Sequence, residues 1–178
     1  MNMNAGDLKT VHDAQVRFFK SHLDARLETI KAYRSDEQDE TINTPALLLE
    51  LERIDEGSDA GDGRDALRCS FTAHCILSNL TDGVEIEVRN FAATVFRLLK
   101  GARFGLEELA GDPEAITAGP GEFKPGAEGY ESWYVNWEQN VYIGESMWEG
   151  GIVPHTVKLG WSPDVGIGHA DDYEQVTE

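Results

Sequence analysis

Hydrophobic residues recur along the chain at two different periods, and the change of period marks the expected elements. Over residues 10–33 they return every three or four positions, and Thr10 with Asp13 offers an N-terminal cap, which predicts an amphipathic helix. Over residues 46–54 and 67–77 the period falls to two, which is typical of half-buried strands. A turn-rich segment joins these two runs, so we expect the strands to pair antiparallel.

A second amphipathic helix is expected in the middle of the chain. It opens at Asp82, where Glu85 three positions later completes a capping box, and it closes near Gly101 or Gly105. The segment that follows, residues 106–129, is rich in glycine and proline. We therefore expect a long, partly irregular loop, which is a common place for partner contacts.

A third alternating run, residues 132–143, predicts a long strand with Trp133 and Trp137 on its apolar face. Gln139 falls on the same face, so it needs a hydrogen-bond partner or a position near an edge. Beyond it, a short strand is expected at residues 156–159 within an otherwise acidic tail.

These patterns predict an α+β fold, with an antiparallel or mixed sheet of about four strands packed against two amphipathic helices. A chain of 178 residues suits one substantial core, and it contains no internal repeat or linker. We expect a single domain over residues 1–146 and a partly irregular extension over residues 147–178.

The net negative charge of the chain makes some classes of binding partner unfavourable. The chain has 33 acidic and 15 basic residues and a formal charge of −18, which argues against a general binder of nucleic acid or anionic membranes. Residues 111–178 hold 13 of the acidic residues and only two cations, Lys124 and Lys158, so a surface formed by them repels polyanions. With no apolar run of membrane-spanning length and no basic, apolar leader at its start, we expect a cytosolic product.

The two cysteines predict neither a disulfide nor a metal site. Cys69 and Cys75 lie on one expected strand, about 20 Å apart, whereas a disulfide needs Cα atoms within roughly 7 Å. His74 points to the opposite face, so it does not converge with them on a zinc ion. We expect reduced thiols, no metal and no cofactor.

Common catalytic motifs, such as a nucleophile elbow, a Walker A loop or a dinucleotide fingerprint, are absent from the sequence. The strongest chemical candidate is a group of aromatic residues with carboxylates, because a glycosidase uses paired carboxylates. The alternation places its tryptophans in the core and Glu138 in solvent, so we expect no catalytic residue. A glycan-cleaving enzyme remains an alternative, resting on Trp133, Trp137, Glu138, Trp148 and Glu149.

The order helix, strand, strand, helix, loop, strand resembles the tail terminators of tailed bacteriophages, in particular the Mu-like prophage minor tail (tail completion) proteins. The similarity covers roughly residues 12–145. It is carried by the hydrophobic strand Pro-Ala-Leu-Leu-Leu-Glu-Leu at residues 45–51 and by the run Tyr-Glu-Ser-Trp-Tyr-Val-Asn-Trp-Glu-Gln-Asn-Val-Tyr-Ile-Gly at residues 130–144. The acidic excess and the long segment after Ser146 depart from that pattern.

The resemblance implies a structural virion protein rather than an enzyme. Such a protein forms a homo-oligomeric ring, usually a hexamer, caps the tail tube, ends its elongation and joins the tail to the neck. Its implied partners are the tail tube protein and a neck, head-completion or connector protein, with a sheath protein as a further candidate. It implies assembly in the host cytoplasm and a final place at the tail–neck junction of the virion. Another head–tail joining or tail-tube protein of similar fold is an alternative.

A ring through which DNA passes without binding benefits from an anionic lining, because attraction between phosphate and cations dominates non-specific DNA affinity. We therefore expect part of the segment after residue 110 to border the channel. The candidate interface residues are large aromatic side chains outside the regular periodicity, since such residues often anchor interfaces. They are Phe123, Trp148 and Trp161, and the alternative is that they close the ends of the core.

Overall fold

The computed structural model describes residues 7–23, 27–33, 42–121, 129–147, 158–163 and 166–175. The chain divides into two compact units, Met1–Ser146 and Met147–Glu178. The elements of the first unit are, in chain order, α1 (Leu8–His22), β1 (Thr29–Ala32), β2 (Ala46–Glu56), β3 (Asp65–Ser78), α2 (Val84–Leu99), β4 (Glu114–Pro120) and β5 (Tyr130–Ile143).

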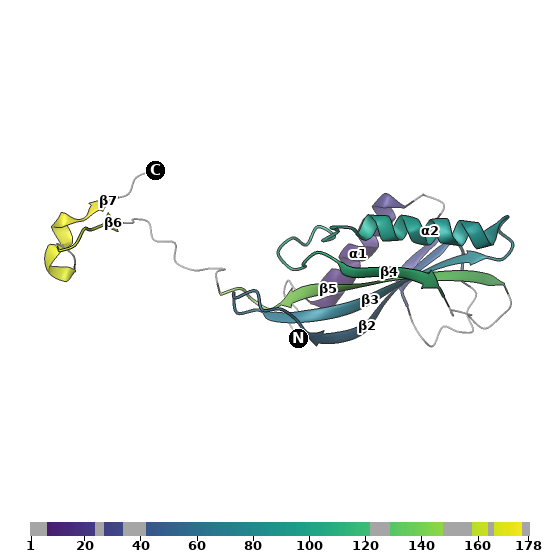
Figure 1. Cartoon of the computed structure of the whole chain (residues 1–178), viewed down its shortest axis with the longest axis horizontal. Helices are drawn as coiled ribbons and strands as arrows, with labels where there is room; N and C mark the ends of the chain where they lie inside the picture. The colour runs from purple at the N-terminus through teal and green to yellow at the C-terminus, as the bar shows by residue number, and fades with distance from the viewer. Residues whose placement is uncertain are drawn as a thin grey trace. The chain divides into compact units, whose positions relative to one another are not determined.

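One mixed sheet with strand order β1-β2-β3-β5-β4 organises the first unit (Figure 1). β1 runs parallel to β2, and every other neighbouring pair is antiparallel. The central strands β3 and β5 pair along their whole length, from Asp65 opposite Ile143 to Ser78 opposite Tyr130. The predicted α+β class is confirmed, as is the antiparallel pairing of the first two alternating runs, while the sheet has five strands rather than about four.

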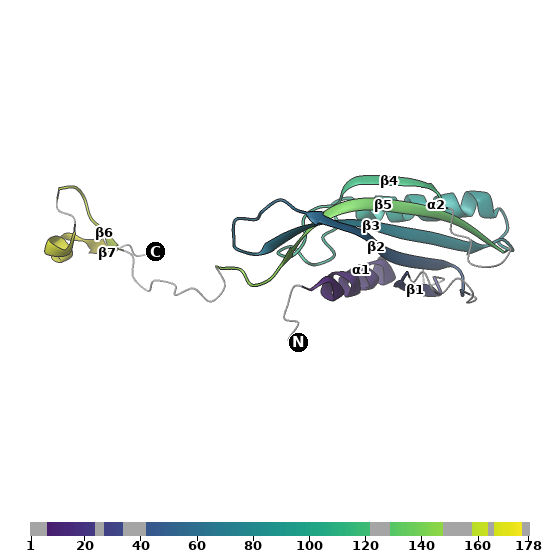
Figure 2. The ribbon, with the colours of Figure 1, turned by 90° about the horizontal axis from the view of Figure 1, so that it is seen from below.

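Both helices pack on the same face of this sheet. α1 lies against β1, whereas α2 crosses β3, β5 and β4, and Figure 2 shows the two helices at opposite edges of the sheet. Because side chains alternate along a strand, every second residue of β2, β3 and β5 reaches this core. Its buried members are Val11, Ala14, Phe19, Leu47, Leu49, Cys69, Phe71, Ala73, Cys75, Ala92, Val95, Leu99, Ala102, Phe104, Val135, Trp137 and Val141.

The first helix is shorter than predicted. It begins after Asp7, whose carboxylate accepts the Thr10 backbone N–H at 2.7 Å, so the predicted cap at Thr10 is wrong. It ends at His22, and the chain then forms β1 instead of continuing to Tyr33 as helix. The apolar spacing continued past the helix end because Ile30 of β1 faces the same core as the helix does.

The second helix lies where it was predicted but begins differently. α2 starts at Val84, directly after Gly83, whose backbone is left-handed with φ 65°. No side chain caps this end, so the predicted capping box of Asp82 and Glu85 is wrong. A left-handed backbone favours glycine, and Gly83 therefore sets the entry into the helix.

The segment predicted as an irregular loop contains an additional strand. β4 pairs antiparallel with β5 at the edge of the sheet, with a register shift between Glu114 and Thr117. The strand ends with Gly119 and Pro120, two residue types that are rare inside strands, so its sequence does not favour a strand. An edge strand tolerates proline because one side of its backbone needs no partner, and this explains why the composition pointed to a loop.

The second unit is small. It holds a two-stranded antiparallel sheet of β6 (Lys158–Leu159) and β7 (Glu174–Gln175), with the 3-10 helix η2 (Ile167–Asp172) between them. The strand predicted at residues 156–159 is therefore confirmed over its last two residues, and the first two lie outside the described ranges. No helix in the described ranges has the length and apolar character needed to cross a membrane.

Candidate interaction surface

One face of the sheet carries no helix in the part of the chain that the structure describes, and we call it the open face. It is polar, in contrast to the helix-covered face, because it receives the alternate residues of each strand. A small apolar cluster around Leu48 and Ile76 occupies one end of it. The polar members from β2, β3 and β5 include Glu50, Glu52, Arg53, Asp55, Arg68, Ser70, Thr72, His74, Tyr134, Asn136, Glu138 and Asn140.

The carboxylates of the open face are paired across the strands. Glu138 accepts a hydrogen bond from Arg68 Nε at 2.9 Å, and Arg53 Nη2 lies 3.6 Å from its other oxygen. His74 Nε2 lies 2.7 Å from a Glu50 oxygen. An exposed arginine–carboxylate pair contributes about 0.2–1 kcal/mol, so the Arg53 and Arg68 contacts order the surface more than they stabilise the fold.

A shallow hollow of about 270 Å³ lies on the open face, between β2, β5 and β4. The hydroxyl of Ser70 and the amide oxygen of Asn136 are both buried and have no hydrogen-bond partner among the described residues. Both residues line the hollow, together with Glu52, Thr117 and Glu138. Its polar lining suits ordered water rather than an apolar ligand.

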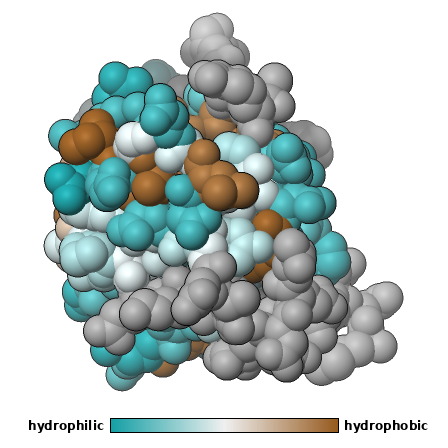
Figure 3. All heavy atoms as spheres, turned by 90° about the vertical axis from the view of Figure 1, so that its right-hand side faces the viewer, coloured by the Kyte–Doolittle hydropathy of each residue, from teal (hydrophilic) through white to brown (hydrophobic). Residues whose placement is uncertain are grey.

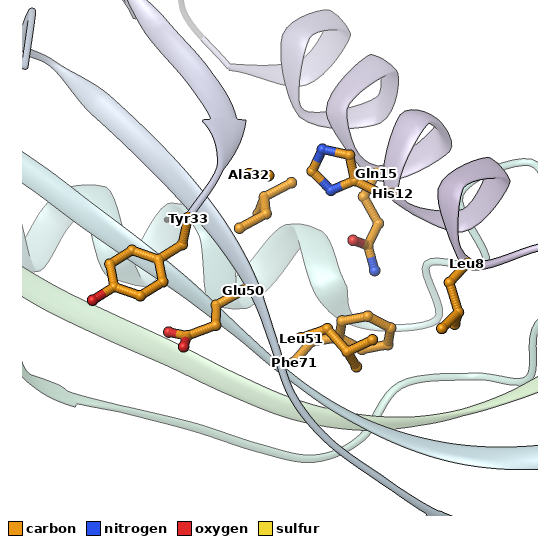
Figure 4. A pocket seen from close by; sticks show the side chains of 9 residues that line it. Leu8, His12, Gln15, Ala32, Tyr33, Glu50, Leu51 and Phe71 are labelled. Atoms are coloured by element: carbon orange, nitrogen blue, oxygen red, sulfur yellow. The ribbon is translucent and has the colours of Figure 1, made fainter. Parts of the chain in front are cut away.

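A second cavity, of about 340 Å³, lies between α1 and β2 at the point where β1 ends, and we call it the α1–β2 cavity. Gln15 is only 1% exposed, and its amide Nε2 has no hydrogen-bond partner in the described ranges. Burial lowers the pKa of the neighbouring His12 below its usual value. Figure 4 shows the lining side chains, which are those of Leu8, His12, Gln15, Ala32, Tyr33, Leu49, Glu50, Leu51 and Phe71.

A third hollow, of about 350 Å³, separates the C-terminal end of α1 from α2. Its apolar lining includes Leu23, Leu77 and Phe91. At the start of α2, Leu80 is 91% and Ile86 55% exposed. Figure 3 faces this end of the molecule and shows separate hydrophobic residues among hydrophilic ones rather than one continuous patch. Scattered exposed apolar residues of this kind do not by themselves mark an interface.

The hairpin that joins β2 to β3 is held by one arginine. Arg64 bonds to the Asp62 carboxylate at 2.6 Å, donates to the Glu108 carbonyl at 2.8 Å and lies 5.3 Å from the Tyr142 ring. This arginine holds the pKa of Asp62 below its usual value. Gly57 is required here, because a Cβ at this position would come within 2.9 Å of the Ala66 backbone. The tip of the hairpin is therefore fixed.

Two of the three predicted interface residues, Phe123 and Trp148, lie outside the described residues. Trp161 lies in the second unit and is 75% exposed. An exposed tryptophan is consistent with an interface anchor. All three assignments stay predictions.

The described residues of the aromatic and acidic group singled out for glycan chemistry lie on opposite faces of β5. Trp137 is fully buried and Trp133 packs against the same core, while Glu138 lies on the open face. Trp148 and Glu149 lie outside the described residues. The guanidinium groups of Arg53 and Arg68 engage the Glu138 carboxylate, so it lacks the free approach that a catalytic acid needs.

The predicted need of Gln139 for a partner is confirmed. Its amide Nε2 donates to the carbonyls of Gly111 at 2.7 Å and Ala102 at 3.3 Å, and its Oε1 accepts from Trp137 Nε1 at 3.3 Å. Gln139 thus ties the segment between α2 and β4 to the middle of β5. The glutamine of the run that resembles tail terminators has a structural role.

The thiols lie in the core. Cys69 and Cys75 are both buried and unpaired, as predicted, and burial raises the pKa of Cys69 to about 11. A raised pKa suppresses the thiolate and therefore the reactivity of the thiol. Within the described ranges, no group of three or more histidine, cysteine or acidic residues is arranged to hold a metal ion.

Sequence reasoning missed the α1–β2 cavity and the edge of β2 beside it. The cavity exists because the chain leaves the helix at His22 and returns as a short strand, whereas the predicted helix over residues 10–33 left no room for it. The signal that was available is Thr29-Ile30, since β-branched residues favour a strand. Gln15 on the buried side of α1 was a second signal.

No protein-family model matches the chain. No curated protein matches it either. Among solved structures, it is similar to the sheath/tube terminator of an extracellular contractile injection system, PVC, determined by cryo-EM in the extended state, with 12% identity and a TM-score of 0.37. The match covers 89% of this chain and 66% of that chain, slightly less than two thirds of it. A likeness at this TM-score does not establish a common fold.

Proposed function

We propose that this chain is a tail terminator, a structural subunit that forms a ring on the end of a phage tail tube. The ring, of six copies, stops elongation of the tube and joins the tail to the neck. The observation that supports the proposal is the role of residues 133–139, which lie within the run 130–144 that resembles tail terminators. The tryptophans and Gln139 pack with the core and Glu138 belongs to the ion pairs of the open face, which supports a structural role for these residues.

The proposed partners are other copies of the chain, the tail tube protein and a neck, head-completion or connector protein, with a sheath protein as a further candidate. Charge supports the passage of DNA through such a ring without binding. The exposed carboxylates of the segment after residue 110 include those of Asp112, Glu114, Glu131 and Glu145. In the proposed ring, part of this segment borders the channel, where it repels phosphate.

A tube-capping assay tests the proposal. The purified chain is added to growing tubes of the cognate tail tube protein, and tube lengths are measured by electron microscopy. A terminator shortens the tubes in proportion to its concentration and is found only at their ends. Self-polymerisation of the chain into tubes would instead identify it as a tube protein, and unchanged tube lengths would contradict the proposal.

The capping assay, together with a measurement of glycan cleavage, separates the proposal from the glycan-cleaving alternative. The double substitution Glu138→Gln with Glu149→Gln removes the carboxylates that a glycosidase would need. For a terminator, capping is retained, because side chains of similar size and polarity replace the two acids. Loss of glycan cleavage by this variant, after cleavage by the natural chain, would overturn the structural assignment.

A further inference from the structure

The outer half of β2 is an unpaired strand edge in the described part of the chain. β1 pairs with β2 only from Ala46 to Leu49, and the Tyr33 N–H donates to the Leu49 carbonyl at 2.8 Å. β2 itself continues to Glu56. On the side away from β3, no other described strand accompanies it there. Such an edge offers main-chain donors and acceptors to an added strand.

The α1–β2 cavity opens at the point where this free edge begins. Its lining contains the end of β1, the middle of β2 and the inner side of α1. Gln15 extends from α1 into it, as Figure 4 shows, and its buried Nε2 has no acceptor among the described residues. A buried donor without an acceptor is costly, so a ligand that brings a carbonyl oxygen to Gln15 is favoured. The main chain of an extended segment brings such an oxygen.

Side chains along the free edge define the chemistry of the occupant. Leu51 is 36% and Ile54 46% exposed, and both lie on the part of β2 that has no neighbour on this side in the described ranges. Residues 50–56 also carry four carboxylates, those of Glu50, Glu52, Asp55 and Glu56, against one arginine, Arg53. Glu50 bonds to His74 and Asp55 to Arg53, but the charge of this edge stays negative. Apolar and basic side chains in alternation complement this edge. A second copy of this chain, with a charge of −18, complements it poorly.

We propose that the α1–β2 cavity and the free edge of β2 bind an extended, basic segment of a different protein. The segment adds to the sheet beside β2 and presents a main-chain carbonyl to Nε2 of Gln15. Its apolar side chains cover Leu51 and Ile54, and its basic side chains face the carboxylates of β2. This inference uses only the edge and the cavity, so it stands independently of the tail-terminator proposal.

The test uses the full chain labelled with ¹⁵N and a synthetic peptide of eight alternating valines and lysines. Titration is followed by NMR through the side-chain amide of Gln15 and the backbone amides of residues 50–56. We expect these signals to shift together. We also expect no binding from a peptide with the same side chains but methylated alternate amide nitrogens, because it lacks the donors for the edge. A peptide of alternating valines and glutamates should bind at least tenfold more weakly.

Two pairs of variants locate the contact. Gln15→Leu should weaken binding of the valine–lysine peptide about 3- to 10-fold, the effect of one lost hydrogen bond. The same change in the second unit, Gln175→Leu, should leave the affinity unchanged. Glu56→Lys should weaken binding, whereas Glu85→Lys on α2 should not. Thermal melting of each variant checks its fold, and Gln15→Leu is expected to fold because it removes an unpaired buried amide.

Several results would overturn the inference. They are equal binding of the lysine and glutamate peptides, shifts confined to β4 at the other edge, or an unchanged affinity in a folded Gln15→Leu variant. If the Gln15 and β2 signals shift with protein concentration alone, the occupant is a second copy, and the assignment to a different protein is wrong.

Discussion

Gln139 gives the sharpest test of the claim that the tryptophan-rich run is structural. The substitution Gln139→Leu keeps the size of the side chain but removes its amide, which bonds to Ala102, Gly111 and Trp137. The Ala102 carbonyl and the Trp137 indole N–H are then left buried without a partner. The hydrogen bond to the Gly111 carbonyl is only partly buried, so a water molecule can replace the lost amide there.

The structure sets the expected size of the effect. Two buried groups without partners cost about 1–3 kcal/mol each, or roughly 2–6 kcal/mol together. Burial of the leucine side chain returns about 1.5–3 kcal/mol. The midpoints of the two ranges differ by about 2 kcal/mol, so we expect Gln139→Leu to lower the free energy of unfolding by about 2 kcal/mol.

Urea denaturation followed by circular dichroism measures this change. A matched control is Asn140→Leu, the same kind of change at the next position, where the side chain points to the opposite face of β5 and is only half-buried. We expect that control to stay within about 0.5 kcal/mol of the natural chain. Gln139→Leu as stable as the natural chain would refute the argument that its amide holds the segment between α2 and β4.

Three further predictions follow from the ion pairs and the thiols. A double-mutant cycle of Glu138→Gln with Arg68→Met should give a coupling of about 0.2–1 kcal/mol that shrinks in 1 M salt, and no coupling would contradict the paired open face. The Arg103 guanidinium lowers the pKa of Asp112 below 3.8, so its contribution is present above that pH and is lost as the pH falls through the lowered value. The stability difference between the natural chain and Arg103→Met, measured by urea denaturation, should accordingly be full at pH 7 and vanish in strong acid, whereas a constant difference would refute this pair. At pH 8, Cys69 should react with a thiol reagent about 100-fold more slowly in the folded chain than in urea, because burial raises its pKa to about 11, and equal rates would place that thiol at the surface.

Much of the fold could be predicted from periodicity, because the three long strands each bury one face. The alternation of β2, β3 and β5 and the apolar stripe of α2 correspond to the core of the structure. The alternation also predicted that Gln139 needs a partner, although it gave no sign that this partner is the backbone at Ala102 and Gly111. Long-range contacts of this kind depend on the tertiary fold.

The rest could not be read from the sequence for physical reasons. β1 has only four residues, and its Ile30 packs against the same core as α1 does. The apolar residues of α1 and β1 therefore follow one helical spacing, which hides the end of the helix. β4 is an edge strand whose backbone is paired on one side, which lets it include Gly119 and Pro120. The α1–β2 cavity depends on where α1 stops, and the boundaries of elements are the least determined part of a sequence pattern.

The most direct test of the structural role is a count of this chain on assembled tails. Tails purified from a strain that produces this chain are measured by quantitative mass spectrometry, with the tube protein as internal reference, and the chain is located by antibody labelling in electron micrographs. The account predicts six copies per tail, all at the end that joins the head. Tails that carry no copy at that end would contradict it.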